Sequence, residues 1–399
     1  MAELLLDKVP GLASALGTEL STWRRAIHAH PELGLQEKET SRLIAGVLAD
    51  HGVTPSVMAE GSGVIGFVSG VGAPTVALRA ELDALPIQEE TDVPYRSTVP
   101  GIMHACGHDG HIAMLLGASI ILQKLAGSLP GSVKLIFQPA EEQSFVGKGG
   151  ARLLVADGVL NGPPVATIAA LHLDPDLQLG TVGLRAGAFM ASSTTFEVTV
   201  QGRSSHGARP HRGVDAIYVA SHVLQAIQGI VARETDALDP KVITVGEIKG
   251  GTSPNIVASE VLLRGTIRTL SSEMKRTVRE RIGERVIAVA RAHGGDATLS
   301  FQELYPPVIN DSRLVELVRE ACAKCPWIDT IKELTSPNLG GDDFAFYTEK
   351  IPGVLFRLGC EGPAHSSPLH SPTFDFDEKV LPIGAALLAA VALKMLEVS

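Results

Sequence analysis

Short apolar runs alternate with amphipathic stretches over the first half of the chain, and again near its end. Five of these runs have the length and composition of buried strands: 63–68, 75–80, 133–138, 166–171 and 353–358. Helical periodicity covers stretches between them, at 12–27, 37–50 and 111–125, with a closing helix from about residue 381. Buried strands that alternate with helices predict an α/β fold, in which an open mixed sheet is covered by helices on both faces.

The pattern changes at about residue 188. Six elements follow in the order strand, helix, strand, strand, helix, strand: 194–201, 214–233, 241–248, 259–268, 272–293 and 296–302. This order is the split unit of a ferredoxin-like α+β domain. We therefore expect an inserted domain at 188–307, which divides the larger domain into two parts, 1–187 and 308–399.

Composition and charge exclude several classes of protein. The chain has 399 residues, a net charge of -10 and no basic run, so it would repel the phosphates of nucleic acid. The longest late apolar run, 383–393, is shorter than the roughly 20 residues of a membrane span, and the first residues carry no secretory pattern. Four cysteines in so long a chain do not form a disulfide framework. We expect a cytoplasmic protein with no membrane or nucleic-acid partner.

Carboxylate, imidazole and thiol groups follow the predicted strands at the point where each strand ends. They are Glu81, Asp83, Glu141, Glu142, His172, His365 and His370, and Cys106 and His108 stand just before a predicted helix. Ligands of open α/β sheets gather outside the carboxyl ends of the strands, so we expect these groups at one edge. Thiolate, imidazole and carboxylate together favour zinc, manganese or cobalt over calcium.

The number of these donors exceeds the three or four protein ligands that one catalytic zinc ion takes, so we expect two divalent metal ions. Glu141 and Glu142 are adjacent, and just after a strand their side chains point in different directions. One of them can bind metal while the other handles protons. Hydrolysis needs this division, in which metals acidify a water and a carboxylate accepts its proton.

The segments 78–87, 103–111 and 137–142 resemble the amidohydrolase branch of the aminoacylase and carboxypeptidase metallopeptidase superfamily. That branch includes hippurate hydrolases, N-acyl-amino-acid amidohydrolases and plant auxin-conjugate hydrolases. Segments 25–33 and 369–372 also match it, so the similarity runs in order over almost the whole chain. The resemblance implies a zinc-peptidase-like larger domain and an inserted domain that acts as lid and dimerisation surface.

By matching position, the resemblance assigns roles in the larger domain. Cys106 would bridge the two ions, zinc or manganese with cobalt as a further candidate. The other ligands would be His108, Glu142, His172 and His370. Glu141 would be the general base and acid. Asp83 would have an orienting role, and Glu81 stands where related peptidases have a metal-binding histidine.

In the inserted domain the resemblance points to His206, which would stabilise the oxyanion by reaching across a homodimer. Asn255 and Arg268 would hold the substrate, since the arginine fork binds both oxygens of a free carboxylate. The chain departs from the family's pattern at 204–205, where serines replace glycines, and at 340–344. These departures concern substrate preference more than the chemistry.

These roles predict hydrolysis of the amide bond of N-acyl amino acids by a water that two metal ions activate. A carboxypeptidase or dipeptidase is the nearest alternative, because it differs only in whether the acyl part is itself a peptide. A cysteine amidase with Cys106 as nucleophile, helped by His104 or His108, would leave the other predicted ligands unexplained. A binding protein without catalysis would be expected to lack the base or a ligand, and here all are present.

Overall fold

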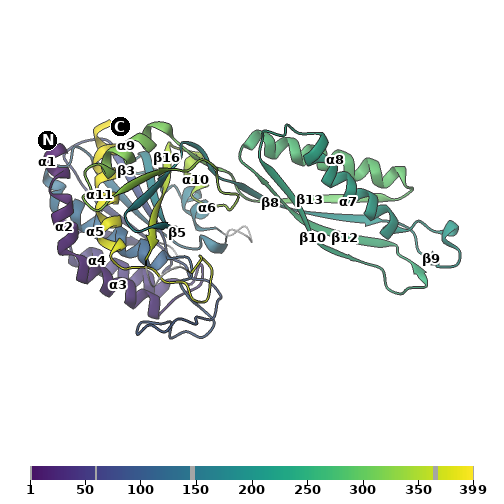
Figure 1. Cartoon of the computed structure of the whole chain (residues 1–399), viewed down its shortest axis with the longest axis horizontal. Helices are drawn as coiled ribbons and strands as arrows, with labels where there is room; N and C mark the ends of the chain where they lie inside the picture. The colour runs from purple at the N-terminus through teal and green to yellow at the C-terminus, as the bar shows by residue number, and fades with distance from the viewer. Residues whose placement is uncertain (1, 59–60, 144–148, 363–366, 399) are drawn as a thin grey trace. The chain divides into compact units, whose positions relative to one another are not determined.

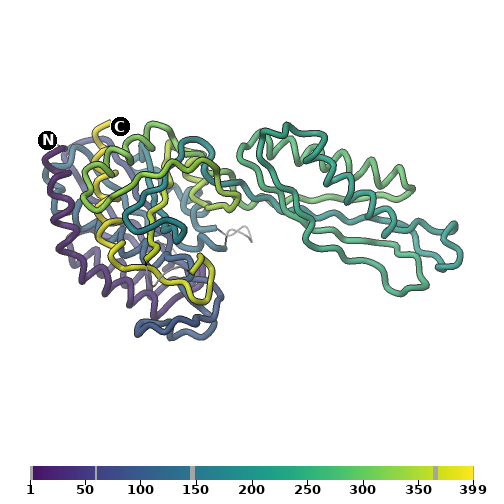
Figure 2. Tube along the Cα trace, in the orientation of Figure 1, coloured from purple at the N-terminus to yellow at the C-terminus, as the bar shows by residue number. Residues whose placement is uncertain are grey.

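The computed structural model describes residues 2–58, 61–143, 149–362 and 367–398, which form two compact units (Figure 1). The first unit consists of Met1–Gly187, Ile309–Ser336 and Asp343–Ser399, and the second of Ala188–Val308 and Pro337–Asp342. In Figure 2 the chain can be followed from the first unit into the second and back, so both of its ends belong to the first unit.

Pro337–Asp342 was expected in the larger domain, but it packs with the second unit. The Ala191 amide donates to the carbonyl oxygens of Asn338 at 3.0 Å and Gly340 at 2.9 Å, and the Asn338 amide donates to that of Phe189 at 2.9 Å. These backbone hydrogen bonds join residues about 150 positions apart, so no local sequence pattern could have revealed them.

Within the described residues, the first unit is built on a mixed eight-stranded sheet. Its strands lie in the order β1 (Thr54–Val57), β2 (Val64–Val68), β4 (Ser132–Gln138), β3 (Thr75–Glu81), β5 (Val165–Gln178), β16 (Gly353–Glu361), β6 (Thr181–Leu184) and β15 (Thr330–Glu333). Neighbours from β4 to β16 are parallel, whereas β2 runs antiparallel to β4 and β6 antiparallel to β16. Every residue of β3 and β4 is buried, as expected for central strands covered on both faces. The predicted mixed α/β sheet is confirmed.

Two long helices, α5 (His108–Leu125) and α11 (Val380–Val398), pack against the central strands and against each other. A Cβ at Gly117 of α5 would lie 2.8 Å from the Cβ of Ala385 in α11, so the helices approach closely at this glycine. The other helices of the unit are α1 (Ala2–Leu6), α2 (Val9–Ala15), α3 (Gly17–Ala29), α4 (Lys38–Asp50), α6 (Gly150–Ala156), α9 (Ser312–Cys322) and α10 (Ala345–Thr348).

The expected helix at 12–27 was wrong in one respect, because α2 and α3 are separate helices that meet at Leu16. Gly17 at this junction has a low helix propensity, which favours a break there. Pro10 stands in the first turn of α2, where its missing N–H costs nothing. The expected helix at 111–125 instead begins at His108, so a predicted metal ligand lies in its first turn.

Among the described residues, two helices of the first unit would be long and apolar enough to cross a membrane by length and composition alone. They are α11 and the stretch His108–Ser128, and the most apolar part of each is 83% and 78% buried, respectively. Buried apolar helices are what the core of a large globular unit contains. The apolar run in the sequence ends at residue 393, but the helix continues, and Lys394 forms ion pairs with Glu320 and Glu397 at its surface.

The second unit contains a four-stranded antiparallel sheet in the order β10 (Lys241–Gly250), β12 (Glu260–Thr269), β8 (Ser192–Gln201) and β13 (Asp296–Tyr305). α7 (Ala216–Arg233) and α8 (Ser272–Ala292) cover one face of it (Figure 1). Alternate residues of β8, including Val198 and Val200, face these helices. The six elements follow the expected order. Two short pairs complete the described strands: β9 (Ser205–His206) with β11 (Ile256–Val257), and β7 (Gly187–Met190) with β14 (Val308–Asn310).

Candidate metal centre

Cys106 and His108 lie at the start of α5. Gly107 between them has a φ of +83°, a left-handed conformation that favours glycine. Both side chains are buried, and His172 of β5 approaches with its Nε2 3.5 Å from Cys106 Sγ. One donor atom from each of these three residues lies within 4.8 Å of the other two. The structure therefore brings together a thiol and two imidazoles.

A second group of donors shares Cys106. Glu142 and His370 each offer an atom within 4.8 Å of each other and of the thiol, and His370 Nε2 lies 3.1 Å from Glu142 Oε1. His370 has a φ of +63°, and its amide donates to the carbonyl oxygen of Ala105 at 2.7 Å. This hydrogen bond to the residue before Cys106 holds the backbone of His370 in a left-handed conformation that residues other than glycine rarely adopt. The five expected ligands thus form two groups with one residue in common.

Hydrogen bonds fix the tautomers of two of the histidines. His108 Nδ1 donates to the carbonyl oxygen of Asp83 at 2.8 Å, and His172 Nδ1 donates to that of Leu173 at 2.7 Å. In the neutral form of each ring, Nε2 then carries the lone pair. His108 Nε2 is buried and has no hydrogen-bond partner among the described residues. A buried nitrogen in this state is costly unless a ligand binds it, which fits a metal ion.

The acid-base properties of Cys106 and His172 also fit a metal ion. Burial, with the Glu142 carboxylate nearby, raises the pKa of the Cys106 thiol to about 12. Burial lowers the pKa of His172 well below its usual range. His172 is therefore neutral, as a metal ligand must be, while Cys106 needs a cation beside it to become a thiolate. For His108, burial lowers the pKa but the neighbouring Cys106 and Asp83 raise it above its usual range, so His108 would have to lose a proton to bind metal.

Glu141 and Glu142 follow β4, and Asp83 holds their backbone. Asp83 Oδ1 accepts the amide of Glu141 at 3.0 Å, and its Oδ2 accepts the amide of Glu142 at 2.9 Å. Each glutamate offers one atom within 4.8 Å of the other and of His108. Asp83 therefore contacts three of the expected site residues, two through its carboxylate and one through its carbonyl oxygen.

Glu81 and His111 also lie near His108, but their hydrogen bonds are directed to protein groups. His111 Nε2 accepts the Leu173 amide at 3.0 Å, so its Nδ1 carries the proton and donates to Glu81 Oε2 at 2.8 Å. Both nitrogens of His111 are occupied, which leaves none for a metal. Glu81 in addition accepts a hydrogen bond from Arg79. The expected donor His365 lies outside the described residues.

Sequence analysis missed a buried arginine behind the site. Arg79 of β3 donates from Nε to Gln138 Oε1 at 2.9 Å and from Nη2 to Asp343 Oδ1 at 2.8 Å. Asp343 also accepts the Ala151 amide at 3.0 Å. The network joins two central strands to segments far along the chain. The available signal was a charged residue within the apolar run 75–80, since a buried arginine needs partners.

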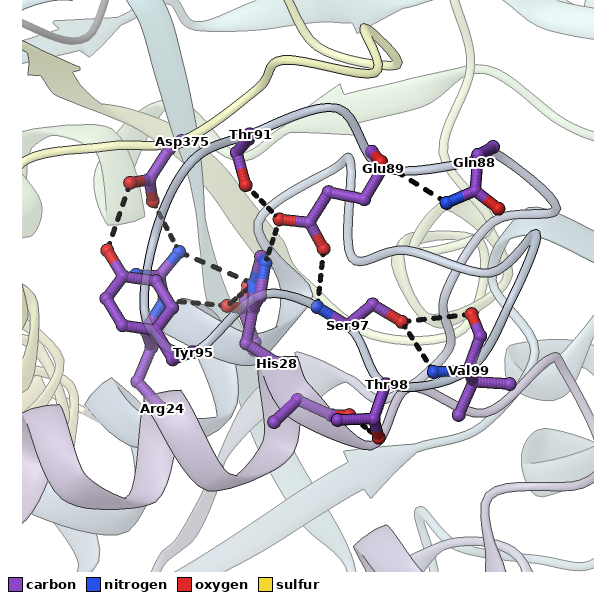
Figure 3. A network of polar contacts seen from close by, with 12 residues as sticks. Arg24, His28, Gln88, Glu89, Thr91, Tyr95, Ser97, Thr98, Val99 and Asp375 are labelled. Carbon is purple, nitrogen blue, oxygen red and sulfur yellow. Dashed lines mark hydrogen bonds and ion pairs between the residues drawn. The ribbon is translucent and has the colours of Figure 1, made fainter.

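A second missed network surrounds Arg24 of α3 (Figure 3). Arg24 Nε donates to Asp109 Oδ2 at 2.7 Å, and its Nη2 donates to Asp375 Oδ1 at 2.6 Å. His28, one turn further along α3, places Nδ1 2.8 Å from Asp109 Oδ2 and Nε2 3.2 Å from Glu89 Oε1. Burial by itself lowers the pKa of His28, but the two carboxylates raise it to about 9. His28 is therefore an imidazolium at neutral pH.

This network is connected to the two segments that carry the expected ligands His108 and His370. Asp109 directly follows His108, and Asp375 lies five residues after His370. The Glu90 amide also donates to the carbonyl oxygen of Pro372 at 2.8 Å. Buried charges on α3 thus fix the chain on both sides of the metal-donor groups.

The second unit holds the remaining expected residues in two separate places. His206 pairs with Ile256 in β9 and β11, and the Gly207 amide donates to the carbonyl oxygen of Asn255 at 2.8 Å, so His206 and Asn255 are close. Arg268 lies near the far end of β12, where its Nη1 donates to the Tyr305 hydroxyl at 2.7 Å. Eight residue steps of β12 separate its first residue from Arg268, which is about 27 Å at ~3.4 Å per step. The structure does not bring Arg268 next to the other two within this unit.

Comparison with known proteins identifies relatives over nearly the full chain. IAA-amino acid hydrolase ILR1-like 4 of Arabidopsis thaliana is 39% identical over 94% of this chain and 84% of its own length. N-acetyl-L-cysteine deacetylase of Bacillus subtilis is 38% identical over 96% of this chain and 90% of its own length. Thermostable carboxypeptidase 1 of Saccharolobus solfataricus is 37% identical over 94% of this chain and 96% of its own length.

A solved structure agrees with these relatives. It is that of Bacillus subtilis YXEP, described as a dinuclear metal-binding peptidase of the M20 family. The match has a TM-score of 0.85 and a sequence identity of 34%, and it covers 97% of this chain and 99% of the YXEP chain. A family model described as peptidase family M20/M25/M40 matches residues 77–394. This protein is therefore a hydrolase of amide bonds and belongs to the M20/M25/M40 peptidase family.

Proposed function

We propose that the protein is a metal-dependent amidohydrolase that cleaves the amide bond between an acyl group and an amino acid with a free carboxylate. The observation that carries this proposal is the sharing of Cys106 between two donor groups, one with His108 and His172 and one with Glu142 and His370. Two ions with one bridging thiolate would use all five donors. The mixed set of thiolate, imidazole and carboxylate donors favours zinc or manganese, with cobalt as a further candidate.

When bound, the ions would polarise the scissile carbonyl and lower the pKa of a water. The chain's own residues would do the rest. Glu141 offers a carboxylate oxygen within 4.8 Å of donor atoms of His108 and Glu142. It would accept the proton of the attacking water and deliver it to the leaving nitrogen. Asp83 would keep Glu141 in place through the amide that it accepts at 3.0 Å.

The relatives' names, taken together, support a substrate class. An IAA-amino acid hydrolase and an N-acetylcysteine deacetylase both act on an acyl group joined to an amino acid, which supports an N-acyl amino acid here. The name of the carboxypeptidase relative supports the alternative, a carboxypeptidase or dipeptidase acting on short peptides. Rates on N-acetyl amino acids, N-benzoyl amino acids and dipeptides, measured side by side, distinguish the two.

The test of the mechanism is Glu141→Gln. We expect it to keep its metal content, measured by elemental analysis, and to lose turnover, because the amide cannot accept the proton. Chelation should also abolish turnover, and added zinc or manganese should restore it. Full activity of Glu141→Gln with metals bound would contradict the mechanism. Activity that survives thorough chelation would instead favour a cysteine amidase, which the high pKa of Cys106 disfavours.

A separate variant tests the bridge. Cys106→Ala removes the donor that both groups share, so we expect weaker binding of both ions rather than of one. Two metals per chain bound with unchanged affinity would contradict a bridging role for Cys106, without contradicting hydrolysis.

We further propose that the protein is a homodimer in which the second unit of one subunit serves the site of the other. Arg268 lies about 27 Å along β12 from Glu260. Glu260 begins β12 three residues after β11, the strand that pairs with His206, so Arg268 and His206 are too far apart to hold one small substrate from the same chain. Arg268 would bind the substrate carboxylate, and the partner's exposed loop with His206 and Asn255 would stabilise the oxyanion and hold the substrate.

All four cysteines are buried and unpaired, which supports a reducing compartment such as the cytoplasm.

Mixing two inactive variants tests this arrangement. A heterodimer of Glu141→Gln and His206→Ala has one complete site if His206 acts on the other subunit, and none if it acts on its own. We therefore expect activity to return when the two variants are unfolded together and refolded. Both homodimers are inactive, so a mixture without heterodimers would show no activity under either arrangement. Native mass spectrometry must therefore show that heterodimers have formed.

A further inference from the structure

The segment 32–37, which we call the strap, lies across the two loops that follow β3 and β4. The Ala84 amide, in the first loop, donates to the carbonyl oxygen of Glu32 at 2.8 Å. At Gly34 a Cβ would lie 3.1 Å from the Cα of Ala140, in the second loop. The strap therefore packs closely on both loops that carry predicted catalytic and metal-binding groups.

The last residue of the strap, Glu37, reaches the second loop with its side chain. It is fully buried, and its Oε1 accepts the Ala140 amide at 2.7 Å. Ala140 has a φ of +52°, and Leu35 in the strap has a φ of +63°. Non-glycine residues adopt this left-handed region at a cost, and they keep it only where surrounding contacts define it.

Three consecutive amides of the second loop are held by buried carboxylates. Glu37 accepts the amide of Ala140, and Asp83 accepts those of Glu141 and Glu142. We propose that Glu37 is a positioning residue for Glu141, because its hydrogen bond fixes Ala140, the left-handed residue that directly precedes Glu141 in the chain. This inference rests on the proposed role of Glu141 as general base.

Helix capping does not explain Glu37. It stands at the N-cap of α4, where a side chain usually accepts one of the first helical amides, but it makes no such bond. Glu32 caps the helix instead, since its carboxylate accepts the amides of Lys38, Glu39 and Thr40. The side chain of Glu37 is thereby available to contact a loop 103 positions further along the chain.

The environment of Glu37 suggests that reach matters more than charge. Burial raises its pKa to about 8, and the nearby Asp83 carboxylate contributes to this rise. A neutral glutamine has the same length and can present its carbonyl oxygen to the Ala140 amide. Aspartate retains the acid but is one methylene shorter, so it cannot accept that amide from the same backbone position.

The experiment compares Glu37→Gln, Glu37→Asp and Glu37→Ala with wild type as the metal-loaded, full-length protein. The probe is whichever N-acetyl or N-benzoyl amino acid the wild type hydrolyses fastest. We expect Glu37→Gln to keep a kcat near that of wild type. In Glu37→Asp and Glu37→Ala, kcat should fall on the order of 10²-fold, as expected for a misplaced catalytic group. KM and metal content should remain close to those of wild type, because the residues that bind substrate and metal are unchanged.

Glu32→Ala is the matched control. It removes a carboxylate from the same strap and uncaps α4, so it should lower the thermal midpoint while leaving kcat near wild type. A kcat of wild-type size in folded Glu37→Ala or Glu37→Asp would overturn the proposal, as would losses of kcat that simply follow thermal stability across all variants. If Glu37→Ala does not fold, the glutamine and aspartate variants decide the question alone.

Glu141→Gln separates this inference from the proposed function. If Glu141→Gln is inactive while folded Glu37→Ala is fully active, only the role of Glu37 fails. If Glu141→Gln is itself active with metals bound, both proposals fail, because there is then no general base at this position to orient.

Discussion

Replacing Asp109 by Asn tests how much the buried network around α3 stabilises the first unit. Asp109 and Arg24 are both completely buried, and Asp109 Oδ2 lies 2.7 Å from Arg24 Nε and 2.8 Å from His28 Nδ1. Asparagine keeps the shape and one acceptor but removes the charge that compensates two cations. Removing one partner of a buried ion pair costs about 3–5 kcal/mol. We expect about 3 kcal/mol here, because an acceptor remains and Arg24 keeps Asp375 as a second partner.

Urea unfolding followed by tryptophan fluorescence measures this loss directly. Both tryptophans, Trp23 and Trp327, belong to the first unit, so their signal reports that unit alone. The measurement should be made with and without chelator, since metal binding stabilises the native state by mass action. Arg25→Met is the control, because Arg25 is half exposed in its pair with Glu378 and should lose at most about 1 kcal/mol.

The reasoning is refuted if Asp109→Asn unfolds within about 1 kcal/mol of wild type, the range of an exposed pair. A changed slope of the unfolding free energy against urea concentration would be a different result. That slope reports the surface exposed on unfolding rather than the stability. A loss near 3 kcal/mol with an unchanged urea dependence supports a buried charge cluster as the element that ties α3 to α5.

Three further predictions concern the same unit. His28 has a folded pKa raised to about 9, so its stabilisation relative to His28→Gln should be complete below about pH 6.5 and lost as the pH rises through the folded value. Urea midpoints of both proteins from about pH 6 to about pH 10 measure this, and a gap that stays constant would contradict it. A methyl group added at Gly46 of α4 would have no other atom within 4 Å, so Gly46→Ala should stabilise by about 0.5–1 kcal/mol. Gly117→Val should destabilise the unit by about 1–3 kcal/mol, because the added side chain meets Ala385. Equal urea midpoints for these two glycine variants would contradict the close approach of α5 and α11 at Gly117.

The carboxyl ends of β3 and β4 could be predicted from the sequence because buried strands leave a local apolar signature. The expected strand 166–171 was wrong at its end, because β5 continues to Gln178. Glu142 follows β4 and His172 lies within β5, and the rule that ligands gather at the carboxyl ends of strands was enough to expect them close together. The structure puts His172 in one donor group with Cys106 and Glu142 in a second group that shares Cys106. The rule says nothing of ring tautomers, so it could not distinguish His108, whose Nε2 lacks a partner among the described residues, from His111, whose two nitrogens are both occupied.

Long-range polar contacts could not be predicted in the same way. Arg24 and Asp375 are separated by 351 positions, and Glu37 and Ala140 by 103, and neither pair has a local pattern that names its partner. In the second unit, the separation of Arg268 from His206 depends on the length and register of β12. Residue types alone placed both in one inserted domain without showing that they lie far apart.

The three non-glycine residues with positive φ in the described part of the chain all lie at the site: Leu35 in the strap, Ala140 before Glu141, and His370. Each left-handed residue costs about 1–2 kcal/mol, so their concentration here needs compensation. Two of the three are held through their own amides, which donate from His370 to the carbonyl oxygen of Ala105 and from Ala140 to the carboxylate of Glu37. The buried carboxylates therefore do more than stabilise the fold, because they hold sharp turns that bring donors from distant segments within reach of one another. On this view, loosening a turn should affect turnover before it affects folding.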